Sequence, residues 1–233
     1  MSGALYALKT VVAQHPSLAL PIARLRGHGV LVDPDTEVLI EGYPRSANSF
    51  SVAAFEMAQG RKTRIAHHTH APAHVLRALA IGVPAIVLIR DPEDAVLEFM
   101  LVRRGLQADH ALRGYLRFYE PLIPHRHRFV LGAFPEVTTD FGRVIRRVNE
   151  LFGTSFAEFV HTTQEERAVF EAMEGYWKGR LGSGDELERR VGRPSPRREE
   201  LKAEFRPAYR AVELAGLRER ADHLYRLLTE ERA

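Results

Sequence analysis

Residues 43–50 place one arginine among small polar side chains. They follow a mainly apolar run over residues 37–42, so we expect a buried strand, a tight loop and then a helix that ends near Gly60. Such a loop presents unpaired backbone N–H groups at the helix N-terminus, where the helix dipole favours negative charge. Arg45 adds a forked cation to neutral donors from Ser46, Asn48 and Ser49. The segment is therefore suited to hold a tetrahedral anion such as phosphate or sulfate.

A cluster of histidines is the second group with chemical potential. It comprises His67, His68, His70 and His74. Imidazole has a reference pKa of about 6.5, so a histidine can take up a proton near neutral pH. Imidazole is also a common metal ligand, but no cysteine or carboxylate lies nearby in the sequence to complete a metal site. Proton transfer is the favoured interpretation, and metal binding is the alternative.

Arg90 closes a continuous apolar run over residues 85–89 and stands directly before a helix start. That start has an N-cap, a proline and two first-turn acids: Asp91, Pro92, Glu93 and Asp94. Glu98 lies within otherwise apolar residues 95–102, so its carboxylate should be buried and should have a partner. We expect Glu98 to pair with Arg90 or with an arginine from residues 189–198.

Each of these three segments also has a purely structural interpretation. Residues 43–50 could be an ordinary turn with an exposed arginine, and the histidines a solvated strand end. Arg90 could be a structural arginine beside a helix cap.

Strand-like and helix-like segments alternate along the first two thirds of the chain. The strands are expected at residues 38–41, 63–67, 85–90 and 129–133. The helices are expected at residues 49–59, 73–80, 92–104, 109–119 and 140–152, the last with Leu151 on its buried face. This alternation predicts an α/β fold, a three-layer sandwich with a central parallel sheet. Because ligands bind at the carboxyl ends of such strands, all three segments should converge on one edge.

The 233 residues are expected to form a single domain. Residues 1–36 would be a helical lead-in, residues 37–156 the α/β core and residues 157–233 a helical part. Within the helical part, residues 179–198 combine a glycine-rich stretch with an arginine-rich, proline-containing one, which makes them a candidate lid.

Composition limits the partners. Lys and Arg total 33 against 30 Asp and Glu, with no long block of like charge, so we expect no nucleic-acid partner. The absence of cysteine excludes disulfides, thiolate metal sites and a cysteine nucleophile. No apolar run reaches the length of a membrane span, and residues 1–13 make a poor signal peptide, so we expect a cytoplasmic protein with no membrane partner. The sequence leaves the oligomeric state open.

Taken in order, the three motifs resemble those of sulfotransferases that use PAPS (3′-phosphoadenosine 5′-phosphosulfate). The family's loop reads roughly Tyr-Pro-Lys/Arg-Ser-Gly-x-Ser/Thr-Trp/Phe, and Ala47 here replaces the glycine. The family's Lys-Thr-His-x-Pro run is matched by Thr69, His70 and Pro72, with His68 in place of lysine. Arg90 opens an Arg-Asn/Asp-Pro-x-Asp run, but Glu98 occupies the place of the family's serine.

The resemblance implies a P-loop NTPase-like fold and a role for each residue. Arg45, with Ser46, Ala47, Asn48 and Ser49, would bind the 5′-phosphosulfate, and Phe50 would stack on adenine. Arg90 and the position of Glu98 would bind the 3′-phosphate, and His70 would be the general base. Arg190 and Arg193 partly match the family's closing loop. PAPS would be the donor and PAP the product, without a metal, and the acceptor a small molecule or carbohydrate.

Residues 129–153 resemble a further segment of the family. There the fourth strand would end in Phe134-Pro135-Glu136. Two other functions stay open. One is a non-catalytic or divergent nucleotide- or anion-binding protein on the same fold, which the departures at Ala47, His68 and Glu98 favour. The other is an ATP-dependent small-molecule kinase, although the second glycine and the lysine of a P-loop are missing.

The acceptor cannot be identified from the sequence. Five aromatic residues could line its pocket or could equally belong to the core: Tyr115, Phe118, Tyr119, Tyr176 and Trp177.

Overall fold

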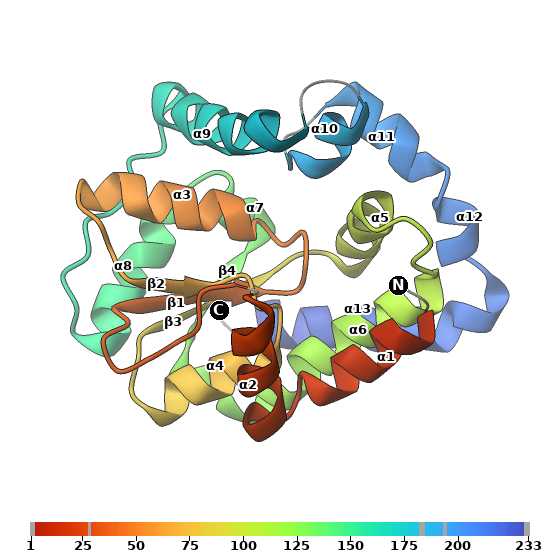
Figure 1. Ribbon diagram of the computed structural model, residues 1–233, viewed down its shortest axis with the longest axis horizontal. Coiled ribbons are helices and arrows are strands. Elements are labelled where there is room, and N and C mark those ends of the chain that lie inside the picture. The colour runs from red at the N-terminus through yellow and green to blue at the C-terminus, as the bar shows by residue number, and fades with distance from the viewer. Residues whose placement is uncertain (1–2, 28, 182–184, 193–194, 231–233) are drawn as a thin grey trace.

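The computed structural model describes residues 3–27, 29–181, 185–192 and 195–230. Its centre is a four-stranded, all-parallel sheet with helices on both faces (Figure 1). The strand order is β2 (Ile65–His67), β1 (Val38–Gly42), β3 (Ala85–Ile89) and β4 (Val130–Ala133). The predicted α/β fold with a central parallel sheet is therefore confirmed.

The central strands are apolar because both of their faces are covered. Every residue of β1 and β3 is buried. Successive side chains point to opposite faces, so Val87 joins one core cluster while Ile86 and Leu88 join the other. Leu39 pairs with Ala85 across the two central strands.

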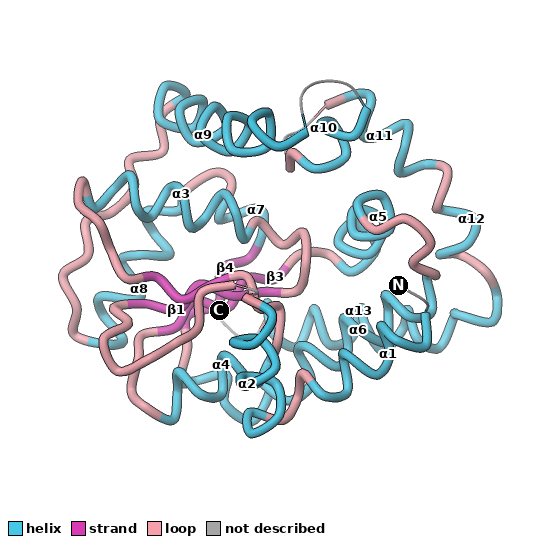
Figure 2. Tube along the Cα trace, in the orientation of Figure 1, coloured by secondary structure: helices cyan, strands magenta, loops and turns pink. Residues whose placement is uncertain are grey.

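Two helical layers enclose the sheet (Figure 2). One layer contains α3 (Asn48–Gln59) and α8 (Phe141–Phe152), which pack on the strands in one core cluster. The other contains α4 (Pro72–Ala80), α6 (Ala108–Tyr119) and α13 (Ala215–Thr229). The sandwich thus has the three layers that the alternating pattern predicts.

Further helices extend this core. Those before α9 are α1 (Gly3–Val12), α2 (Pro16–Arg26), α5 (Pro92–Val102), the 3-10 helix η1 (Glu120–Arg128) and α7 (Phe134–Val137). The C-terminal part is helical as predicted, with α9 (Thr163–Leu181), α10 (Asp185–Arg190), α11 (Pro196–Ala203), α12 (Arg206–Tyr209), the 3-10 helix η2 (Val212–Leu214) and α13. α9 and α10 lie above α3 and α5 in Figure 1, while α13 returns beneath the sheet.

Three local details differ from the sequence-based expectation. Residues 134–136 belong to helix α7 instead of ending β4, because Pro135 cannot donate to a strand ladder. Leu151 is 47% exposed and therefore lies off the buried face of α8. Val30 forms an antiparallel bridge with His67, so the segment before β1 also reaches the edge of the sheet.

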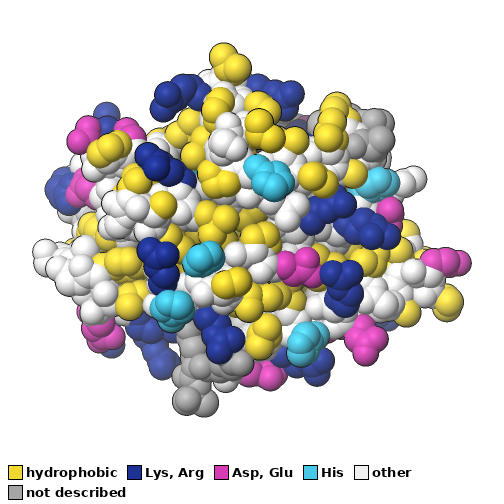
Figure 3. Space-filling view, turned by 90° about the horizontal axis from the view of Figure 1, so that it is seen from below, with side chains coloured by type: hydrophobic (Ala, Val, Ile, Leu, Met, Phe, Trp, Pro, Cys, Tyr) yellow, Lys and Arg dark blue, Asp and Glu magenta, His cyan; other side chains and the backbone are white. Residues whose placement is uncertain are grey.

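The surface mixes side-chain types. On the face shown in Figure 3, Lys and Arg side chains stand singly or in small groups among hydrophobic and acidic ones. In the described ranges, no helix is both long and apolar enough to cross a membrane.

Candidate functional site

The ends of three strands open into one cavity of about 1050 Å3. β1 leads into the loop of residues 43–47, β2 into residues 68–71 and β3 into Arg90. Arg45, His70 and Arg90 all line this cavity, so the predicted convergence of the three segments is confirmed. The remaining walls come mainly from α1, α3, α5, α6 and α9.

The loops after β1 and β2 carry unusual backbone. Arg45 and Ala47 have left-handed conformations, with φ of 74° and 69°, and so do His68 and His70, with φ of 61° and 51°. Ala47 is the N-cap of α3 and stands where the sulfotransferase loop usually has glycine, which takes this conformation without a Cβ penalty. Strained backbone of this kind concentrates at functional sites.

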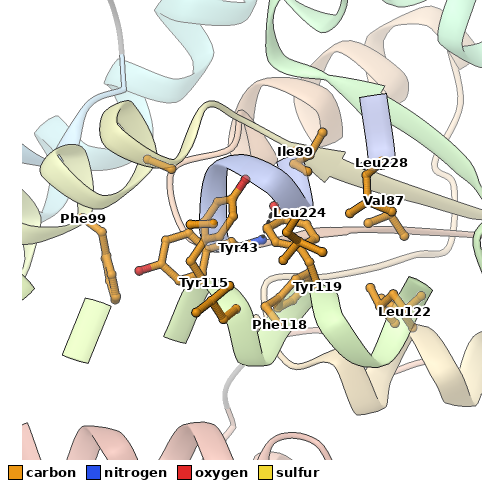
Figure 4. Close-up of a cluster of buried hydrophobic side chains, with 14 of the residues drawn as sticks. Tyr43, Val87, Ile89, Phe99, Tyr115, Phe118, Tyr119, Leu122, Leu224 and Leu228 are labelled. Atoms are coloured by element: carbon orange, nitrogen blue, oxygen red, sulfur yellow. Dashed lines mark hydrogen bonds between the residues drawn. The ribbon is translucent and has the colours of Figure 1, made fainter. Parts of the chain in front are cut away.

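Tyrosines of α6 hold these loops in place (Figure 4). The hydroxyl of Tyr119 accepts a hydrogen bond from the N–H of Tyr43 (3.2 Å) and donates one to the carbonyl of Leu88 (2.7 Å). The hydroxyl of Tyr115 donates to the carbonyl of Arg90 (2.8 Å). Because both side chains are fully buried, Tyr115 and Tyr119 belong to the core and not to an acceptor pocket.

The polar residues of the loop have different surroundings. Ser46 is fully buried, with its hydroxyl 3.4 Å from that of Tyr119, and a contact of its side chain with a ligand stays a prediction. Asn48 donates from its amide to the carbonyl of Tyr43 (3.1 Å), which closes the loop. Ser49 lines the cavity, with its hydroxyl 3.1 Å from Nε2 of His68.

Phe50 offers little surface to an adenine. Its ring packs near those of Phe159, Phe170 and His161, with centroid distances of 6.3, 5.7 and 6.0 Å. The residue is only 4% exposed, although it contributes to the cavity wall. Stacking on a nucleotide base stays a prediction, and it requires one of these neighbours to move.

Arg45 reaches across the cavity toward α10. Its Nη1 donates to the carbonyl of Arg190 (3.2 Å), and its Nη2 lies 3.4 Å from Oε2 of Glu98. Burial and the nearby cations Arg90 and Arg198 lower the pKa of Arg45 to about 10, although Glu98 opposes this shift. A Cβ at Gly192 would lie 2.9 Å from Nη2 of Arg45, so the chain at Gly192 closes tightly over the guanidinium.

Glu98 is buried and has two arginine partners, Arg198 and Arg45. Nε of Arg198 donates to Oε1 (3.3 Å) and its Nη2 to Oε2, while Lys202 lies 3.8 Å from Oε1. Burial raises the pKa of Glu98, but the positive charges of Arg45 and Arg198 outweigh it and hold the pKa at about 2. The expected pairing with an arginine from residues 189–198 is confirmed.

Arg198 also forms hydrogen bonds within residues 179–198, the segment predicted as a lid. Its Nη1 donates to the carbonyls of Arg189 (3.0 Å) and Val191 (2.8 Å), which ties α11 to the end of α10. The guanidinium of Arg190 stacks over the ring of Trp177 at 5.7 Å, so the backbone of Arg190 reaches Arg45 while its side chain turns to α9. Arg193, the other proposed closing residue, lies outside the described residues.

Arg90 lies between two motifs. Its Nη1 donates to the carbonyl of Arg45 (3.3 Å), its Nη2 lies 3.4 Å from Asp94, and its guanidinium covers the ring of Phe134 at 4.0 Å. Its Nε is buried and has no hydrogen-bond partner among the described residues, and the same is true of Nε of Arg45. Two donors at the cavity wall thus lack an acceptor.

His70 has the geometry of a base. Its Nδ1 lies 2.9 Å from the carbonyl of Gly42, and because a carbonyl can only accept, Nδ1 must carry the proton. Nε2 of the neutral ring therefore keeps its lone pair. Burial and the charges of Lys9 and Arg45 lower the pKa of His70, although Glu41 opposes this, so the neutral form prevails at pH 7.

Glu41 is a site residue that the sequence analysis missed. This fully buried carboxylate accepts hydrogen bonds from the N–H and the hydroxyl of Thr69 (2.6 and 2.8 Å) and from the N–H of His70 (3.2 Å). Burial raises its pKa, but hydrogen bonds from His74 and Thr69 hold the pKa at about 2. The signal was present, because a glutamate inside an apolar strand needs partners.

His74 serves this buried network and does not face a ligand. Its Nε2 accepts a hydrogen bond from the N–H of Val32 (2.8 Å), so its Nδ1, 3.0 Å from Glu41, carries the proton. Across the described part of the chain, no group of three or more His, Cys, Asp or Glu side chains could hold a metal ion. Because both ring nitrogens of His74 have protein partners, His74 is not free to bind a metal as one of the four histidines.

The cavity has a second set of cations that no motif indicated. Lys9 of α1, Arg103 at the end of α5 and Arg117 of α6 line its wall. They are far apart in the sequence, so neither spacing nor periodicity could have brought them together in advance.

At the level of sequence, neither a protein-family model nor a curated protein matches the chain. Among solved structures, the chain is similar to mouse sulfotransferase SULT7A1 complexed with PAP. The identity is 13%, the TM-score is 0.43, and the match covers 82% of this chain and 90% of the mouse chain.

Proposed function

We propose that this chain is a sulfotransferase that moves a sulfuryl group from PAPS to a hydroxyl or amine of a small molecule or carbohydrate. The observation that carries this proposal is the shared cavity. Arg45, His70 and Arg90 come from three strand ends and line the same space. A fixed cation, a neutral base and a second cation at one sheet edge suit transfer of a charged group.

The residues present fit an anionic donor. Nε of Arg45 and Nε of Arg90 are buried donors without an acceptor in the described ranges, and phosphate or sulfate oxygens would satisfy them. The N-terminus of α3 adds backbone N–H groups and a favourable dipole. PAPS, when bound, would supply the sulfuryl group and a phosphate leaving group.

Two side chains divide the chemistry. His70 takes the proton of the acceptor hydroxyl at Nε2 as the acceptor oxygen forms its bond to sulfur. The bond from sulfur to the 5′-phosphate oxygen breaks, and that oxygen keeps the electron pair. Arg45 stabilises the resulting negative charge, as preorganised cations do in phosphoryl transfer. No covalent bond to the protein is needed.

A divergent nucleotide- or anion-binding protein is the second candidate, and Glu98 favours it. This carboxylate takes the place of the serine that binds the 3′-phosphate in the family. Its charge is offset by Arg198 and Arg45, so a phosphate would meet a neutralised carboxylate and not a lone negative charge. Weaker recognition of the 3′-phosphate is the expected consequence.

Calorimetry with PAP (adenosine 3′,5′-bisphosphate) tests the donor site, with 5′-AMP and ATP as controls. We expect PAP to bind more tightly than 5′-AMP, because Arg90 contributes to a 3′-phosphate site. Equal or absent binding of PAP would contradict the proposed donor. A protein that binds PAP but transfers no sulfate from radiolabelled PAPS to a broad panel of acceptors would favour the second candidate.

A further inference from the structure

The cavity has two ends with different electrostatics. At the donor end, beside Arg45, the carboxylate Glu98 supplies a counter-charge. At the other end, α1 and α6 lie against each other and contribute Lys9 and Arg117, while Arg103 follows α5. All three of these cations are partly buried.

Among the described residues, neither Arg117 nor Lys9 forms an ion pair with a carboxylate. Nη1 of Arg117 donates to two uncharged groups, the carbonyl of Ala7 (3.2 Å) and the hydroxyl of Thr10 (2.8 Å). Burial, and then the charge of Arg103, lower the pKa of Lys9, although the charge of Glu41 opposes this shift.

Three carboxylates at or near the cavity already have partners. Glu98 is held by Arg198, and Glu199 by Lys202 at 2.7 Å. Glu41 is fully buried and accepts hydrogen bonds from Thr69 and His70. A partly buried cation without a counter-charge is costly, so an anion that enters this end gains charge-assisted hydrogen bonds from Lys9 and Arg117.

This cationic end lies beside the candidate base. Lys9, Arg117 and His70 line the same cavity, and the charge of Lys9 contributes to the lowered pKa of His70. A group bound at Lys9 would therefore sit close to a hydroxyl presented to Nε2 of His70. A neutral phenol or sterol would leave these charges unused.

We propose that the acceptor is an anion: a hydroxyl or amine compound that already carries a carboxylate, sulfate or phosphate group, held by Lys9 and Arg117. This inference rests on the proposed function, because it names the substrate class of the same site. The negative group binds at the α1–α6 wall and directs the reacting hydroxyl toward His70.

Matched pairs of hydroxyl compounds test the inference by calorimetry on the full chain. The pairs are 3-(4-hydroxyphenyl)propanoate and its amide, glucose 6-phosphate and glucose, and N-acetylglucosamine 6-sulfate and N-acetylglucosamine. We expect the anionic member to bind about tenfold more tightly in at least one pair. Lys9→Gln should remove that preference, whereas Lys62→Gln, at an exposed position outside the cavity, should keep it. Equal thermal midpoints would show that both variants fold.

The inference would be overturned if no anionic compound bound more tightly than its neutral partner. It would also be overturned if Lys9→Gln kept the preference for the anionic compound. A titration with PAP on the same samples separates this failure from that of the donor proposal. If PAP fails to bind while the anion preference depends on Lys9, the cationic subsite stands and PAPS is the wrong donor. If PAP binds and neutral compounds accept sulfate as well as charged ones, the sulfotransferase proposal stands and the anionic acceptor is wrong.

Discussion

Both ends of the cavity carry buried or partly buried cations, but the two ends differ in whether these cations have an acidic partner. At the donor end, the carboxylate of Glu98 compensates Arg45 and Arg198 and helps to fix α11 to α5. At the α1–α6 end, Lys9 has no acidic partner in the described chain and Arg117 has only neutral ones. The cations of the donor end therefore already have a counter-charge within the protein, whereas Lys9 and Arg117 would gain one from a bound anion.

This difference indicates where binding energy would be gained. An anion at the donor end competes with Glu98 for Arg45, so part of its interaction energy replaces an existing ion pair. An anion at the α1–α6 end meets Lys9 and Arg117, which form no ion pair with a carboxylate of the described residues. Five changes to the protein or to its conditions test this difference between the two ends.

His70→Ala removes the proposed general base, which lines the same cavity as Arg45 and Lys9. We expect the rate of sulfuryl transfer to fall by about 10²–10⁴-fold, because general-base catalysis contributes on that order. The affinity for PAP should stay the same, since the contacts of His70 are to Gly42 and Glu41 and not to the Arg45 loop. Transfer rates and PAP calorimetry on the same sample measure both effects.

The matched control for this change is His127→Ala, at an exposed position outside the cavity. A His70→Ala variant with full activity would show that His70 is not the base.

Arg198→Ala breaks the compensated ion pair at the donor end. Glu98 would keep Arg45 but lose its other arginine in a buried site, and breaking such a pair costs about 3 kcal/mol of unfolding free energy. Denaturant unfolding measures the loss. Arg167→Ala, which removes an exposed pair with Glu171, should change little. If both variants lowered the unfolding free energy by a similarly small amount, the ion pair between Arg198 and Glu98 would not be needed for stability.

Acid should act on the two buried carboxylates. The pKa values of Glu98 and Glu41 are held at about 2, below the ordinary value of 4.5. Because the folded-state pKa is depressed, this stabilisation is present above pH 4.5 and is lost as the pH falls toward 2. Unfolding free energies measured across this range should decline steeply. In Glu98→Gln the decline should be shallower, and an unchanged slope would remove Glu98 from this account.

Glu98→Ser removes the carboxylate that pairs with Arg45 and Arg198, so the donor end, like the α1–α6 end, would lack this internal counter-charge. We expect PAP to bind about tenfold more tightly, because a phosphate then replaces the lost counter-charge at Arg45 and Arg198. Calorimetry on the variant and the original chain measures the change. The opposite result, unchanged or weaker PAP affinity, would show that Glu98 does not compete with the 3′-phosphate.

Ala47→Gly tests the backbone of the donor loop. At φ 69°, glycine avoids a Cβ penalty, so the unfolding free energy should rise by about 1 kcal/mol. Ala54→Gly, in the buried interior of α3, should lower it by a similar amount. Thermal and denaturant unfolding distinguish the two signs. Destabilisation by Ala47→Gly would mean that the left-handed conformation is not strained.

Much of the fold could be predicted because its signals are local. Apolar runs set β1 and β3, and Asp91 and Pro92 set the start of α5, where Asp91 does accept the cap bond from Asp94. The prediction failed where tertiary contacts decide: Leu151 fits a helical stripe but is exposed. Tertiary packing also decides the surroundings of Ser46, whose hydroxyl is buried beside that of Tyr119.

The alternation of strands and helices can be read from the amino-acid sequence, and so can the order of the three motifs and the need of Glu98 for a partner. These follow from periodicity, capping residues and the cost of a buried charge, which act over a few neighbouring residues. Only the tertiary structure decided that Arg198 is that partner, that Glu41 and not a metal engages His74, and that Lys9 and Arg117 share a wall. Those contacts join residues far apart in the chain, so they exist only once the layers have packed.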